Sequence, residues 1–152
     1  MVTDVTMGVP GGTFGGVGIN MNADTWRSLS EEQRTSVLYG AAQAAAETVM
    51  LYYEDHVEAL RRINESSSIT LHEPDEELVK ATRNFIKQDL KTVAAHYQEQ
   101  YGIDDAKSRM ESFRETLSEW VAKVEGIETR EQLSELYWEE VFSKVDTSSY
   151  SL

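Results

Sequence analysis

Three histidines and many carboxylates are the side chains that could hold a metal ion or move a proton. The histidines are His56, His72 and His96, and no two of them have the i, i+4 spacing of a helical zinc site. Glu54, Asp55 and His56 are adjacent, but neighbouring residues on a helix point about 100° apart and do not converge on one ion. We therefore expect a solvated helix face, no metal site and no cofactor.

Catalytic groups are equally sparse. The chain has no cysteine, which excludes thiol catalysis and cysteine–zinc sites. Carboxylates 75–77 lie at a predicted helix start, where the helix dipole favours acids without any catalytic role. The serines at 66–68 lack the flanking glycines of a nucleophile elbow. The sequence therefore predicts a protein that is not an enzyme.

A glycine-rich stretch from Gly8 to Gly18 is the one segment that suggests a ligand loop. Six of the nine glycines lie in the first 18 residues. The stretch has no lysine, which a P-loop needs, and its glycines lack the spacing of a dinucleotide loop. Two interpretations stay open: a bent loop that leads into an edge strand, or a loop whose backbone lines a ligand cleft.

The elements around this loop are mostly helices. A short strand is predicted over Thr13–Met21, and Asn22 can cap a short helical turn. Ser30 and Gln33 form a capping box, which opens a helix over about 31–64. Roughly 34 helical residues span about 50 Å, whereas a compact chain of this length is about 40 Å across. The helix must kink, protrude, or lie across a second copy or another domain.

Shorter elements follow. A strand is predicted at 68–72, and Pro74 fits the first position of a helix that ends at Gly102. A third helix, over about 104–125, carries an apolar stripe with a period near 3.5 residues. Thr129 and Gln132 form a second capping box for a last helix. The expected organisation is a glycine-rich loop and strand at 1–22, a helical domain at 23–145 and a flexible tail at 146–152.

Composition narrows the function classes. The chain has 152 residues, 40% of them hydrophobic, and a net charge of −13. This acidity disfavours nucleic-acid binding and docking on anionic lipid. The first basic residue is Arg27, so the N-terminal sequence does not fit a secretory signal peptide. We expect either a cytoplasmic protein or a longer parent protein that begins upstream.

The order of these segments resembles the C-terminal part of the solute-binding proteins of TRAP transporters, the DctP-like family. A glycine-rich strand leads to Ile19-Asn-Met-Asn-Ala-Asp-Thr-Trp26, then to Ser-Leu-Ser-Glu-Glu-Gln33 and an alanine-rich helix. The ending Glu139-Glu-Val-Phe-Ser-Lys144 is also similar to that family. The positions that fit the pattern of the first segment and its helix are Asn20, Trp26, Leu29, Ser30, Gln33, Ala41, Ala42 and Ala45.

The resemblance implies an exported parent of two lobes that captures small organic acids, dicarboxylates among them, and delivers them to the membrane components of a transporter. The parent would be periplasmic, and a long helix would run across both lobes. The arginine that holds the solute carboxylate in the family would lie upstream, since no arginine precedes Arg27. The ligand neighbours left in this chain would be Met7, Gly8, Gly11, Gly12, Thr13 and Phe14.

Phe14 could equally be a core residue. The expected fold is mainly α with two or three short strands, an α+β fragment of a two-lobed periplasmic-binding-protein fold. It contains one very long helix and about three shorter ones. The expected function is solute capture, incomplete in this chain. The alternative is a helical dimerisation or interaction module without solute binding. We also expect self-association, because apolar faces would otherwise lie in water.

Overall fold

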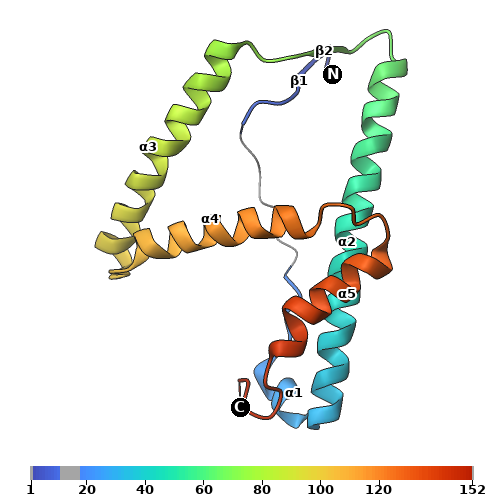
Figure 1. Ribbon diagram of the computed structural model, residues 1–152, viewed down its shortest axis with the longest axis vertical. Coiled ribbons are helices and arrows are strands. Elements are labelled where there is room, and N and C mark those ends of the chain that lie inside the picture. The colour runs from blue at the N-terminus through green and yellow to red at the C-terminus, as the bar shows by residue number, and fades with distance from the viewer. Residues whose placement is uncertain (1, 11–17, 152) are drawn as a thin grey trace. The chain divides into compact units, whose positions relative to one another are not determined.

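The computed structural model describes residues 2–10 and 18–151, and it is mainly helical, as predicted (Figure 1). Five α-helices, one 3-10 helix and two short parallel strands lie in the described part of the chain. In chain order the elements are β1 (Asp4–Thr6), α1 (Ala23–Ser28), α2 (Glu31–Glu65), β2 (Thr70–His72), α3 (Glu76–Tyr101), α4 (Ala106–Lys123), α5 (Arg130–Glu140) and η1 (Phe142–Lys144).

The chain divides into two compact units. The α3–α4 unit contains the described residues up to 10 together with 60–125, and the α2–α5 unit contains 18–59 and 126–151. Helix α2 therefore contributes most of its length to one unit and its last turns to the other. The two units are described separately below.

The long helix is confirmed. Helix α2 has 35 residues, a length of about 52 Å at 1.5 Å per residue. The predicted capping box begins it: the Ser30 amide donates to Gln33 Oε1 at 2.8 Å, and the Gln33 amide donates to Ser30 Oγ at 3.2 Å. The helix continues unbroken through Gly40, where a Cβ atom would meet nothing within 4 Å. The small residue at this position is therefore not required by packing against the described residues.

The α3–α4 unit begins with a two-stranded parallel sheet. Val5 of β1 pairs with Leu71 of β2, and the Met7 amide extends the ladder by donating to the His72 carbonyl at 2.9 Å. His72 Nε2 also lies 2.8 Å from Asp4 Oδ1. The strand predicted at 68–72 is thus present in shortened form. The strand predicted at Thr13–Met21 is wrong for residues 18–21, which form no strand, and its remaining residues lie outside the described part.

Helices α3 and α4 form the rest of this unit. Asp75 caps α3 by accepting the Leu78 amide at 2.7 Å, so Pro74 precedes the cap. The prediction that Pro74 is the first helical residue is wrong, because the aspartate side chain takes over the capping role one residue later. Gly102 ends α3 with φ +65°, as its position predicted.

The α2–α5 unit is built around Trp26 and Arg34. Trp26 is 7% exposed, and its indole N–H donates to the Tyr150 carbonyl at 2.8 Å. Arg34 is 8% exposed and donates to the carbonyls of Trp26, Arg27 and Thr147 at 3.2, 3.2 and 3.0 Å. Thr147 is itself buried. The segment expected as a flexible tail thus supplies two of the carbonyls that surround this cluster.

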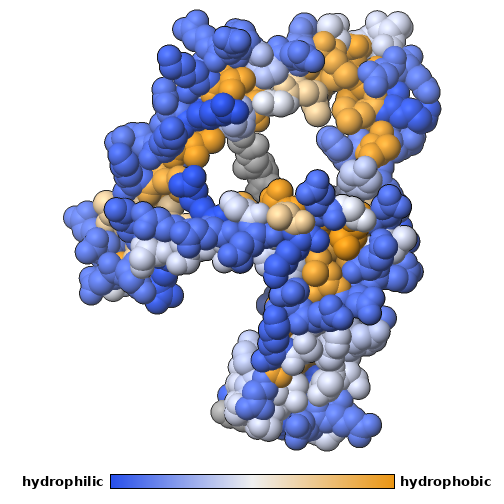
Figure 2. Space-filling model, in the orientation of Figure 1, coloured by the Kyte–Doolittle hydropathy of each residue, from blue (hydrophilic) through white to orange (hydrophobic). Residues whose placement is uncertain are grey.

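Large apolar side chains are widely exposed. Among the described residues the buried apolar ones are mostly alanines, and no large side chain is less than 2% exposed. On α4, Phe113, Leu117 and Val121 are 65%, 53% and 65% exposed. Figure 2 shows apolar surface along both α2 and α3. The helices therefore have apolar faces that the described part of the chain leaves in contact with water.

Candidate functional site

The predicted ligand-binding loop is only partly within the described residues. Met7 uses its backbone N–H in the sheet, as the donor to His72, so that N–H is not available to a solute. Gly8 is exposed and has φ +76°, and a Cβ atom there would meet the Pro74 ring at 3.8 Å. Gly11, Gly12, Thr13 and Phe14 lie outside the described residues. Whether this loop lines a solute cleft remains a prediction.

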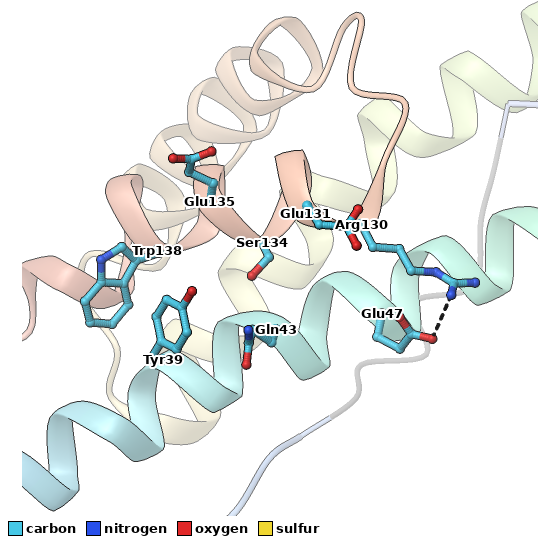
Figure 3. A pocket seen from close by; sticks show the side chains of 8 residues that line it. All are labelled: Tyr39, Gln43, Glu47, Arg130, Glu131, Ser134, Glu135 and Trp138. Carbon is cyan, nitrogen blue, oxygen red and sulfur yellow. Dashed lines mark ion pairs between the residues drawn. The ribbon is translucent and has the colours of Figure 1, made fainter.

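A groove lies between α2 and α5 in the α2–α5 unit. Its volume is about 460 Å³, within the size range of small-molecule sites. Figure 3 shows the side chains that line it: Tyr39, Gln43, Glu47, Arg130, Glu131, Ser134, Glu135 and Trp138. Neither Met7 nor Gly8 belongs to this lining.

Local sequence signals position α5. The Thr129 hydroxyl accepts the Gln132 amide at 3.2 Å, and Gln132 Oε1 accepts the Thr129 amide at 3.1 Å. This capping box fixes the first turn of α5, where Arg130 lies. Leu133, one residue after the box, is 3% exposed and anchors the helix.

An ion cluster forms one end of the groove. Arg130 Nη1 lies 3.2 Å from Glu47 Oε1, and Nη2 lies 2.8 and 2.9 Å from the two carboxylate oxygens of Glu54. Glu47 and Glu54 are seven residues apart, which is about two helical turns and places them on one face of α2. The single arginine of α5 therefore joins two acids of α2, and its positive charge is largely neutralised.

An aromatic pair forms the other end. The rings of Tyr39 and Trp138 meet edge to face, with centroids 5.2 Å apart and an interplanar angle of 81°. This is a favoured geometry for aromatic pairs. On the same helix, burial raises the pKa of Tyr137 above its usual range, so this phenol stays neutral at physiological pH.

The groove offers little for bond-making chemistry. Its lining contains two hydroxyls, the Ser134 alcohol and the Tyr39 phenol, and no histidine among the described residues. No hydrogen bond within the described residues joins Ser134 Oγ to a carboxylate or imidazole that could act as a base. The ion cluster and the aromatic pair instead join α5 to α2, so the evident role of these contacts is to hold the two helices together.

Metal and membrane sites were also considered for residues 2–10 and 18–151. In these ranges no group of three or more His, Asp or Glu side chains could hold a metal ion. Helices long and apolar enough to cross a bilayer are likewise absent from the described ranges.

The groove contacts were not predicted from the sequence. Tyr39 and Trp138 are separated by about a hundred residues, and Arg130 by 76 residues from Glu54. The spacing of Glu47 and Glu54 on one helix face was the only local signal that could have pointed to a shared cation.

The sequence and the structure were compared with known proteins. No protein-family model, curated protein or solved structure matches the chain.

Proposed function

We propose that this chain is the C-terminal portion of an extracytoplasmic solute-binding protein of a TRAP transporter, which captures small organic acids for uptake. The resemblance of residues 19–33 to the DctP-like family motivates the proposal. The observation that carries it is helix α2, whose 35 residues span two separate compact units. The resemblance implies one long helix that runs across both lobes of the parent, and a helix of this length fits that expectation.

The exposed apolar faces support the same proposal. A parent protein would cover them with elements of its other lobe, as a two-lobed fold requires. In this proposal the upstream part of the parent supplies the arginine that binds the solute carboxylate. The loop from Met7 to Phe14 then contributes backbone contacts to the solute, and the protein carries out no chemical reaction.

Sequencing the DNA upstream of the Met1 codon tests the proposal directly. We expect an open frame that begins with a signal peptide and encodes a first lobe with an arginine. The extended protein should then show a saturable rise in melting temperature with mono- or dicarboxylates, because a ligand of the native state stabilises it. A stop codon and a ribosome site immediately before Met1 would contradict the proposal, as would an extended protein whose melting temperature no carboxylate changes.

A second candidate is a helical association module, and the exposed stripe on α4 favours it. Phe113, Leu117 and Val121 recur every four residues on one side of α4 and are all more than half exposed. Such a stripe can pair with a second copy. Sedimentation of the chain and of Leu117→Glu tests this candidate. We expect a concentration-dependent dimer that the variant abolishes, and a monomer at high concentration would rule this candidate out.

A further inference from the structure

Helices α3 and α4 pack against each other close to the turn that joins them (Figure 1). A second groove lies between these two helices, within the α3–α4 unit. It has a volume of about 530 Å³. The α3 residues recur at helical spacing, so that they share one face, and so do the α4 residues. The lining comprises Lys87, Leu90, Lys91, Ala94, Ala95, Gln98, Lys107, Met110, Glu111 and Arg114.

The floor of this groove is apolar. Leu90 and Met110 are half-buried, and Ala94 between them in the lining is buried. The lining on α3 runs from residue 87 to residue 98, a length of about 17 Å at 1.5 Å per residue. The groove is therefore long enough for a short apolar chain or a ring, and methionine adapts easily to such shapes.

The charged side chains of the groove are nearly all positive. Four cations and one carboxylate line it, although the whole chain carries 14 cations against 27 acids. Lys107 lies 3.8 Å from Glu111, the one carboxylate. Lys87, Lys91 and the Arg114 guanidinium form no ion pair or side-chain hydrogen bond with any described residue. This contrasts with Arg27, Arg109 and Arg130, each of which has a carboxylate within 3.2 Å.

We propose that the α3–α4 groove binds a small anionic amphiphile, a carboxylate on a short apolar body. The apolar body lies on Leu90, Ala94 and Met110, and the carboxylate lies among the unpaired cations. Arg114 can donate two parallel hydrogen bonds to a carboxylate, and the lysines add positive potential. This inference is independent of the proposed function, because the groove is made entirely by α3 and α4 of this chain.

Charge and surface together select this class of ligand. A wholly polar anion would leave the apolar floor in water, and a neutral apolar molecule would leave three cations without a partner. A polyanion as large as a nucleic acid would meet the strong negative charge of the rest of the chain. A carboxylate with an apolar body satisfies both parts of the groove.

Titration with octanoate, followed by two-dimensional amide NMR of the full chain, tests the proposal. We expect saturable shifts confined to α3 and α4, with a dissociation constant on the order of 1 mM for a ligand of this size. Octanamide, which has the same tail without the charge, should bind more weakly. Raising the salt concentration should weaken octanoate but not octanamide.

Matched variants identify the cations responsible. The double variant Lys87→Gln/Lys91→Gln should bind octanoate about fivefold more weakly, since exposed ion pairs are modest. Lys80→Gln, an exposed lysine on α3 outside the groove, should bind like the unmodified chain. Arg114→Gln is the second test of the head-group contact. Circular dichroism melts show whether each variant is folded.

Several results would overturn the proposal. They are equal binding of octanamide and octanoate, equal weakening by Lys80→Gln and the double variant, shifts spread outside α3 and α4, or no shifts at all. Shifts that follow protein concentration and not octanoate would assign the groove to a second copy of the chain and would equally overturn it.

Discussion

Replacing Arg34 by methionine tests the account of the α2–α5 unit. The guanidinium donates three hydrogen bonds to backbone carbonyls and lies 5.9 Å from the centre of the Trp26 ring. Hydrogen bonds from a charged group contribute about 1.5–3 kcal/mol each. Methionine retains part of the apolar stem of arginine, and water can reach some of the carbonyls in the variant. We therefore expect the free energy of unfolding to fall by about 3 kcal/mol.

Urea unfolding followed by tryptophan fluorescence measures this loss. With a slope of about 2 kcal/mol per molar, the expected loss lowers the unfolding midpoint by about 1.5 M. Arg34→Lys should recover part of the stability, since lysine keeps the charge but cannot reach three carbonyls with a planar fork. The matched control is Arg27→Met, which removes an exposed arginine whose Nη1 lies 3.0 Å from Asp24 Oδ1, one helical turn earlier.

The control variant Arg27→Met should lower the free energy of unfolding by less than about 1 kcal/mol, because exposed ion pairs contribute little to stability. Equal midpoints for Arg34→Met and Arg27→Met would refute the reasoning. The three carbonyl contacts would then have no more influence on stability than one surface ion pair.

Three further predictions concern the other contacts. Arg130→Gln should lower the free energy of unfolding by about 1 kcal/mol in low salt and by less in high salt, which urea melts at two ionic strengths would show. The hydrogen bond from His72 holds the pKa of Asp4 below its usual 3.8, with a smaller effect from the neighbouring threonine. The stability from this contact is therefore present above pH 3.8 and is lost as pH falls through the lower folded-state pKa of Asp4. Carboxyl NMR titration of the chain and of His72→Gln should show that the titration midpoint of Asp4 rises in the variant. Gly102→Ala should destabilise the fold by about 1 kcal/mol, because φ at this residue is +65°. Gly40→Ala, in the middle of α2, should instead stabilise the fold by about 0.5–1 kcal/mol. Thermal melts in which both variants shifted the melting temperature in the same direction would contradict this prediction.

The helix boundaries were predictable because their signals are local. The side chains of Asn22, Ser30 and Thr129 all accept backbone amides two or three residues ahead, and a pattern this short is visible in the sequence. Gly102 similarly ends α3 through its own backbone conformation. Such interactions depend on nearest neighbours and are little changed by the rest of the fold.

Contacts between distant segments could not be predicted in this way. Strand β1 has only three residues, and its pairing with β2 joins residues 66 positions apart, so no alternating pattern was long enough to indicate it. Arg34 lies among ordinary polar residues in the sequence, and only carbonyls from residue 147 and from α1 make its burial favourable. Of the candidate site, the loop at Met7 and Gly8 was proposed from the family resemblance, whereas the two grooves arise from helix pairing.

The hydrogen bond between Arg34 and Thr147 has a consequence for synthesis of the chain. It closes a loop of 113 residues, for which the entropy cost is about 4 kcal/mol. At about 5–20 residues per second, roughly 6–23 s separate the emergence of the two residues from the ribosome. Throughout that interval α1 and the first turns of α2 exist without the carbonyl and aromatic partners that bury Trp26 and Arg34. The N-terminal half of this unit must therefore wait, unassembled, until residues 147 and 150 have left the ribosome.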